Sequence, residues 1–268
     1  MLGALLLAAA ACGAPEGAPT PGLTTVTGLA LPFDAYKPTA AQRTLLGNAH
    51  DLLVVRCLRR HGVTGRSPGP DPVALAAADL GNTRRYGVVD PGLAARFGYH
   101  LARPVAARTP ARTAAPARRH LYGHPGRPGC LDRATARMNR GVPEADWRWL
   151  TAQDARSLER AAARPAVRQA AERWKTCMAS TGHPYASPTA AIADQRWDLA
   201  KAMITGDERR TALADTSCKW SSGLVAAWFA TDAEVQRRVV LRQADRFAAL
   251  RANLSERLAR AIALLRRR

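Results

Sequence analysis

The four cysteines that follow the N-terminal region carry the strongest structural signal in this sequence. CLRRHGVTGRSP (residues 57–68) and CMASTGHPYASP (residues 177–188) both place a glycine five positions after a cysteine and a proline eleven positions after it. A helix that ends at a glycine, followed by a proline that prevents its continuation, produces this spacing. The repeat therefore predicts two helices, each with a cysteine near its C-terminal end.

A cysteine near a helix end can be bridged to the next segment without distorting the helix. Apart from Cys12 the chain has four cysteines, an even number that suits two disulfides in an oxidising compartment. We predict the pairs Cys57–Cys130 and Cys177–Cys218, whose loops of about 70 and 40 residues correspond to about 4 kcal/mol each. Two related helical modules follow from this pairing, in halves of about 39–140 and 145–268.

The chain begins with an apolar run from Leu2 to Ala11 that stops at Cys12. A membrane-spanning helix needs about 20 apolar residues, so this run is typical of a signal peptide instead. The stretch AAAC at residues 9–12 resembles a bacterial lipobox, which predicts a signal at 1–11, a lipid on Cys12 and a flexible tether over 12–38. An ordinary secretory signal cleaved nearby is the alternative. Either interpretation places the protein outside the cytoplasm, on the outer face of the cell membrane or secreted.

Residues 39–268 are expected to form a mostly helical domain. Thr39 and Gln42 have the spacing of a capping box, and Leu45, Leu52 and Cys57 follow at helical intervals up to Gly62. The N-terminal signals of later helices lie at Thr151 with Asp154, at Pro165, at Ser187 with Pro188, and at Asp207, where a helix to Ala230 is expected.

A last long helix is expected to begin at the capping-box pattern Thr231-Asp232-Ala233-Glu234. Apolar residues recur in it every seven positions, at Val240, Phe247, Leu254 and Ala261. This spacing predicts a helical hairpin packed on the preceding helix.

The formal charge of +19 comes almost entirely from arginine. No acidic residue lies between Pro91 and Leu131, and from about 103 to 128 arginines alternate with Pro, Ala, Gly and Thr, so a disordered basic loop is expected there. Such a charge usually suggests nucleic-acid binding. Export removes that partner, so anionic lipid head groups, acidic wall polymers or an envelope protein are the expected partners. A basic surface without a dedicated partner is the alternative.

Two candidate catalytic patterns are discounted. Gly65-Arg66-Ser67-Pro68-Gly69 matches a G-x-S-x-G elbow, but Pro68 lacks the N–H that the oxyanion hole requires. His120, His124 and Cys130 have loose zinc spacing, yet they lie in the Pro/Gly-rich loop and Cys130 is assigned to a disulfide. We therefore predict no catalytic residue, no metal ligand and no cofactor.

Other conspicuous residues have structural interpretations. Asp194 and Asp198 lie four apart beside Arg196 and are typical of surface charge. The tryptophans are expected mostly in the core. They are Trp147, Trp149, Trp174, Trp197, Trp220 and Trp228.

The motifs RRYGVVDPGLAARFGYH, PGCLDRA, RWKTCMASTGHPY and ALADTSCKWSSGLVAAWFATDAEVQRR resemble a group of exported actinobacterial proteins of the lipoprotein type. The resemblance covers roughly residues 40–245. It implies secretion, four paired cysteines and a mostly helical domain, and it supplies no catalytic residues.

The sequence thus favours a membrane-anchored lipoprotein that acts as a non-enzymatic binding or structural component of the cell envelope. An extracellular hydrolase or a metal-dependent enzyme is the alternative, and the sequence leaves the oligomeric state open.

Overall fold

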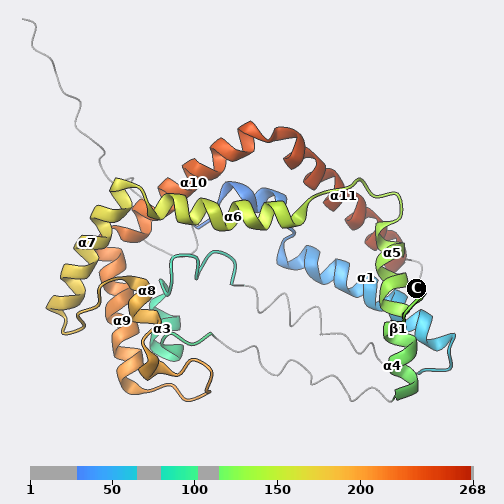
Figure 1. Ribbon diagram of the computed structural model, residues 1–268, viewed down its shortest axis with the longest axis horizontal. Helices are drawn as coiled ribbons and strands as arrows, with labels where there is room; N and C mark the ends of the chain where they lie inside the picture. Colours follow the sequence, from blue (N-terminus) through green and yellow to red (C-terminus); the bar gives the residue numbers. More distant parts are fainter. Residues whose placement is uncertain (1–28, 65–79, 102–114, 267–268) are drawn as a thin grey trace, which may run out of the picture.

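The structure is a computed structural model that describes residues 29–64, 80–101 and 115–266. These residues are mostly helical, and the elements form an arch (Figure 1). Their bounds are η2 Pro32–Tyr36, α1 Ala40–Arg59, α3 Pro91–Phe97, α4 Ala115–Tyr122, β1 Gly123–His124, β2 Arg127–Pro128, α5 Cys130–Asn139, α6 Trp147–Ala162, α7 Pro165–Ser180, α8 Pro188–Ile192, η3 Gln195–Trp197, α9 Gly206–Ser221, α10 Leu224–Arg242 and α11 Ala244–Arg266. None of the described helices is long and apolar enough to cross a bilayer.

The arch has two ends joined by a helical span. Helices α6 and α10 run along the top with η2, while α3, α7, α8 and α9 form one end and α1, α4 and α5 form the other (Figure 1). Helix α11 descends from the span onto α1 and α5. We call residues 80–101 and 165–222 the α7–α9 lobe, and residues 40–64, 115–141 and 244–266 the basic arm.

Both predicted disulfides are present. Cys57 is bonded to Cys130 and Cys177 to Cys218, with sequence separations of 73 and 41. The two disulfides indicate an oxidising environment.

The glycines of the two repeats end their helices in the same way. Gly62 and Gly182 have φ of +73° and +82°, which glycine adopts without a steric penalty. The residue after each glycine donates its amide hydrogen to the carbonyl of the residue that follows the cysteine, at 3.0 Å for Val63 and 2.9 Å for His183. This is the Schellman pattern, so the local part of the repeat has one geometry in both copies.

The division into two modules is not confirmed. Helix α3, from the first half of the chain, packs on α9, and α11, from the end of the chain, packs on α1. The cysteine partners also differ, because Cys130 is the first residue of α5 while Cys218 lies in the last turn of α9. The two halves of the sequence therefore exchange segments.

Two segments expected to lack structure are partly ordered. The end of the expected tether packs into the core, where Leu29, Leu31 and Phe33 are buried and η2 lies beneath α10. The expected basic loop contains α4 and the two-stranded β1–β2 ribbon from residue 115 onward. Leu121 anchors it, since its side chain is buried against the Cys57–Cys130 disulfide cluster. The remaining residues of both segments lie outside the described ranges.

The expected helix boundaries after residue 145 need three corrections. Helix α6 begins at Trp147, where the Asp146 carboxylate accepts from Trp149 N–H at 2.8 Å, rather than at Thr151. The helix expected to run to Ala230 breaks at Gly223, with φ +72°.

The capping-box pattern at Thr231 lies inside α10, and that helix ends at Arg242. The Asp232 carboxylate caps nothing because tertiary partners occupy it, as described below.

Candidate functional site

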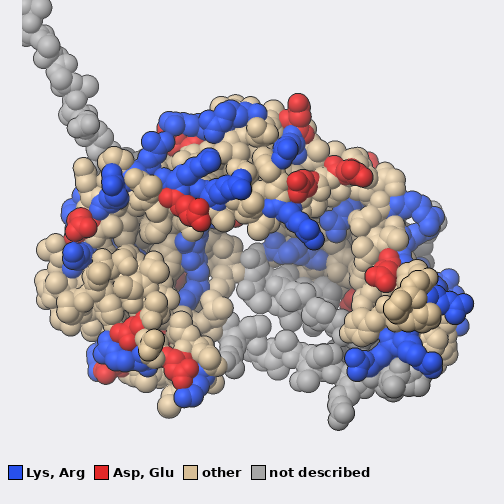
Figure 2. All heavy atoms as spheres, in the orientation of Figure 1, with Lys and Arg blue, Asp and Glu red and all other residues tan. Residues whose placement is uncertain are grey.

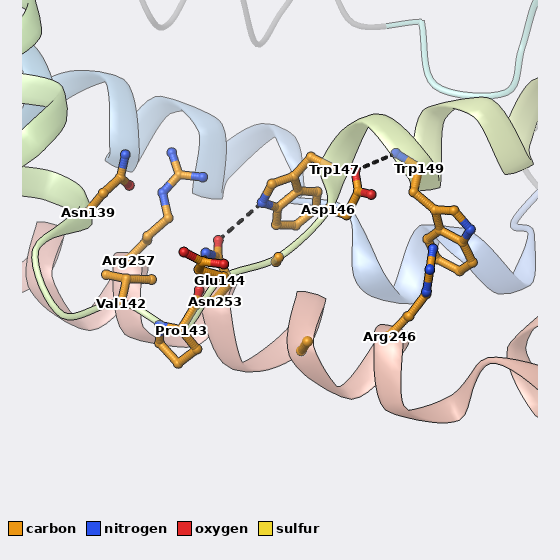
Figure 3. Close-up of a pocket in the computed structure, with 12 residues that line it drawn as sticks. Asn139, Val142, Pro143, Glu144, Asp146, Trp147, Trp149, Arg246, Asn253 and Arg257 are labelled. Atoms are coloured by element: carbon orange, nitrogen blue, oxygen red, sulfur yellow. Dashed lines mark hydrogen bonds between the residues drawn. The ribbon is translucent and has the colours of Figure 1, made fainter.

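An open groove of about 860 Å³ lies between α11 and the loop that leads from α5 into α6 (Figure 3). The side chains that define its chemistry come from both walls. They are Asn139, Glu144, Asp146, Trp147, Trp149, Arg246, Asn253 and Arg257.

Asn253 ties the two walls of the groove together. Its Nδ2 donates to the Pro143 carbonyl at 2.7 Å, and its Oδ1 accepts from Trp147 Nε1 at 3.2 Å. Both bonds span more than 100 residues of sequence, so they hold the loop in place against α11. The groove is therefore preformed rather than assembled from mobile side chains.

Two arginines of α11 line this groove, and their contacts differ. Arg246 lies over the Trp149 ring, with its guanidinium carbon 5.1 Å from the ring centroid. Arg257 is half-buried, its Nε has no hydrogen-bond partner among the described residues, and burial lowers the pKa of its guanidinium. An uncompensated cation in a partly desolvated recess is suited to an anionic ligand.

Positive charge is concentrated in the basic arm. Its 75 described residues contain 15 Lys and Arg against 4 Asp and Glu, whereas the other 135 described residues contain 19 against 14. The arm thus has a net charge of +11, and the rest of the described chain has +5. Figure 2 shows basic groups spread over the α1–α5 end with few acidic groups beside them on that face.

The most strongly buried charges lie elsewhere, in the α7–α9 lobe. Lys219 Nζ contacts Asp215 Oδ2 at 2.8 Å, and both side chains are fully buried. Asp215 also accepts from Trp174 Nε1 at 2.9 Å, and Lys219 donates to the Val88 carbonyl at 3.1 Å. Burial raises the pKa of the Asp215 carboxyl and lowers the pKa of the Lys219 ammonium, against their mutual attraction.

A second buried carboxylate in this lobe holds the end of α3. Glu208 Oε1 accepts from the Tyr99 amide at 2.8 Å and lies 2.8 Å from His100 Nδ1. The opposite nitrogen of the His100 ring lies 3.0 Å from the Lys201 carbonyl. Like the Asp215–Lys219 pair, this contact is closed to a substrate and serves packing.

Asp232 belongs to a third internal network, under the span. Its Oδ2 accepts from Arg85 Nε at 2.6 Å and from the Tyr86 hydroxyl at 3.1 Å. Arg85 also pairs with Asp154 at 2.9 Å. Burial, together with the Asp232 charge, raises the pKa of Tyr86. The polar residues of the RRYG and ATDAEVQ motifs therefore hold Arg85 and Tyr86 against α6 and α10.

The structure does not bring together His120 and His124, the histidines of the discounted zinc spacing. His120 stacks on His61, with ring centroids 4.4 Å apart, while His124 lies 3.2 Å from the neighbouring Pro125 carbonyl. Ligand atoms of His61, Cys57 and Cys130 lie within 4.8 Å of one another, but both sulfur atoms are bonded to each other. A thiolate ligand would therefore require reduction of the disulfide.

The remaining candidates have ordinary partners or fall outside the described ranges. Asp194 pairs with Arg196 at 2.7 Å and accepts from the Tyr185 hydroxyl at 2.7 Å, which together lower the pKa of its carboxyl, and Asp198 pairs with Lys201. Cys12 and the Gly65–Gly69 pattern lie outside the described residues.

Comparison with protein-family models, with curated proteins and with solved structures gives no match to this chain.

Sequence reasoning missed the polar row of α11. It identified the apolar stripe of Phe247, Leu254 and Ala261, but Arg246, Asn253, Arg257 and Arg260 recur beside that stripe at intervals of seven, four and three. Helical spacing could have placed these four residues on one face. Nothing in the sequence shows that this face meets α5.

Proposed function

We propose that this protein is a non-enzymatic, membrane-tethered component of the cell envelope that binds an anionic envelope polymer through its basic arm. The observation that carries the proposal is the segregation of charge, +11 on 75 residues of the arm against +5 on the other 135 described residues. A generally basic composition would spread arginine over both parts. Concentration on one arm creates a local field that attracts a polyanion.

The oxidising environment indicated by the two disulfides supports this choice of partner. Outside the cytoplasm, anionic lipid head groups and acidic wall polymers are the abundant counter-charges. The lipobox at Cys12 supports a tether to the membrane, and this part of the proposal depends on the sequence.

The buried charges support a binding role over catalysis. Asp215, Lys219, Glu208 and Asp232 are completely buried and engaged by internal partners. A general acid or base must reach a proton of the substrate. These groups instead stabilise the α7–α9 lobe and the span.

Binding of the purified protein to a polyanion, measured by calorimetry at 50 and 200 mM salt, tests the proposal. We expect affinity to fall steeply with salt, because binding releases counterions. One variant neutralises four exposed arginines of the arm, Arg59, Arg60, Arg127 and Arg133, to Gln. Its control neutralises four exposed arginines of α6, α7 and the turn between them, Arg156, Arg160, Arg164 and Arg168.

The arm variant should lose far more affinity than the control. Equal losses in both variants, or no binding by the wild-type protein at 50 mM salt, would refute the proposal. The tether is tested separately in cells. Processing that is blocked by globomycin and partition into Triton X-114 are expected, and unlipidated protein recovered free in the medium would rule the tether out.

A further inference from the structure

A small recess of about 300 Å³ lies where the end of α5 meets α11. It is lined by Arg137 and Arg140 from the end of α5, and by Arg260, Ala263 and Leu264 from α11. Three of its five lining residues are arginines and none is acidic. The recess is separate from the larger groove of Figure 3, whose lining includes Arg257 but none of these five residues.

Arg260 is held in position by the end of α5. Its Nη1 donates to the Met138 carbonyl at 3.3 Å, to the Arg137 carbonyl at 3.5 Å and to the Arg140 carbonyl. These carbonyls belong to the C-terminal turn of α5, whose acceptors have no partner within the helix. One edge of the guanidinium is therefore fixed, and this reduces the entropy that a ligand would lose by ordering the side chain.

The three positive charges have no acidic counterpart nearby. In the described part of the chain no carboxylate oxygen lies within 4.0 Å of a nitrogen of Arg137, Arg140 or Arg260. The acid of α5, Asp132, accepts from the Gly129 amide at the opposite end of the helix. Like-charged groups that line one recess repel each other, and an anion between them would relieve that repulsion.

We propose that this recess binds a phosphodiester group, so that the anionic polymer of the proposed function is a phosphate-linked one. The inference rests on that proposed function. A guanidinium presents two parallel N–H donors that match two oxygens of a phosphate. A phosphodiester carries its charge on two non-bridging oxygens that project from a tetrahedral phosphorus, and each of them can accept from a different guanidinium.

The apolar side of the recess fits the same ligand class. Ala263 and Leu264 offer carbon surface beside the three cations, which suits the C–H groups of a sugar or polyol that joins successive phosphates. Arg257, one turn before Arg260 on α11, has no carboxylate oxygen within 4.0 Å of its nitrogens among the described residues, and its Nε has no hydrogen-bond partner there. A polymer that follows α11 from the recess would therefore meet a further guanidinium without an acidic partner.

The test compares two double variants that remove the same charge from the same arm. Arg137→Gln with Arg140→Gln alters the recess, and Arg118→Gln with Arg119→Gln alters α4. All four side chains are exposed, and Arg260, which caps α5, is left intact so that both variants fold. Affinity for inorganic polyphosphate is measured by calorimetry in 0.15 M salt. Polyglutamate and phosphatidylglycerol vesicles are the other two probes.

We expect the R137Q/R140Q variant to lose at least about tenfold in affinity for polyphosphate, and the R118Q/R119Q variant no more than about threefold. Polyglutamate should bind more weakly than polyphosphate and respond equally to both variants. If binding to vesicles responds in the same selective way, the phosphodiester comes from a lipid head group rather than a polymer.

Two results would overturn the inference, and they have different consequences. Equal losses of polyphosphate affinity in both variants would show that the arm attracts polyanions without a specific site in the recess. The proposed function would then still stand. Failure of the wild-type protein to bind any of the three probes would overturn the proposed function as well.

Discussion

Replacing Lys219 by methionine tests whether the Asp215–Lys219 pair is as deeply buried as the structure shows. The substitution removes the ammonium that contacts Asp215 at 2.8 Å and leaves the carboxylate with neutral donors such as the Trp174 N–H at 2.9 Å. Methionine fills a similar volume, so the main effect is electrostatic. Removing one partner of a buried ion pair typically costs about 3–5 kcal/mol.

The structure suggests the origin of this cost. Without its counter-charge Asp215 would take up a proton on folding, and from an unfolded pKa of about 3.9 this requires roughly 4 kcal/mol at pH 7. Burial already raises the pKa of Asp215 in the wild-type protein. Because a raised folded-state pKa means that the native state holds the proton more tightly, the deficit of K219M shrinks by roughly 1.4 kcal/mol per pH unit as the pH falls toward 4.

The assay is urea unfolding followed by tryptophan fluorescence at pH 7 and pH 5, with both disulfides intact. Adding Asp215→Asn to K219M should restore about 2 kcal/mol, since an amide still accepts from Trp174 and carries no charge. The control is Arg210→Met, which breaks the exposed Arg210–Asp207 pair of the same helix and should cost no more than about 1 kcal/mol.

Two results would refute this reasoning. If K219M were no less stable than R210M, the pair would be solvated and the interior of the lobe misplaced. If the loss did not depend on pH, or if D215N failed to recover stability, an unpaired carboxylate would not be its cause.

The remaining predictions concern the turn at Gly87, the disulfides and the histidine pair. Gly87 and Gly62 both have a positive φ, of +82° and +73°, but a Cβ at Gly87 would lie 2.7 Å from Lys219 Nζ, whereas a Cβ at Gly62 would meet open space. Gly87→Ala should therefore lower the unfolding free energy by at least about 1 kcal/mol more than Gly62→Ala in the same urea titration. Replacing either disulfide by two serines should cost up to about 4 kcal/mol, and equal unfolding curves with and without reductant would contradict this estimate. Metal analysis of the oxidised protein should find well below one zinc per chain, because Cys57 and Cys130 are bonded to each other. One zinc per chain that is lost on His61→Ala or His120→Ala would instead favour the metal-dependent alternative.

The sequence by itself determined the local features of this protein. The Cys-x4-Gly pattern placed two helix ends, and Thr39 and Pro165 placed two helix starts. Joining each cysteine of the repeat to the cysteine of the next helical stretch gave the observed disulfide pairs. These features depend on residues close to one another in the chain, where backbone preference and capping dominate.

The tertiary structure alone decided which segments meet. The capping-box pattern at Thr231 predicted a helix start that is absent, because the Asp232 carboxylate accepts hydrogen bonds from Arg85 and Tyr86 instead of capping a helix. Both partners lie almost 150 residues away in the sequence. Residues 29–38 belong to the expected tether and residues 115–128 to the expected basic loop, so neither segment predicted a core, yet apolar side chains such as Phe33 and Leu121 find partners supplied by distant helices.

The basic arm and its recess belong to this second class. Arg137 and Arg260 are 123 residues apart, and their approach depends on α11 packing back onto α1 and α5. The sequence composition shows the excess of arginine. Only the fold shows where the arginines gather, because residues far apart in the sequence meet only when the helices pack.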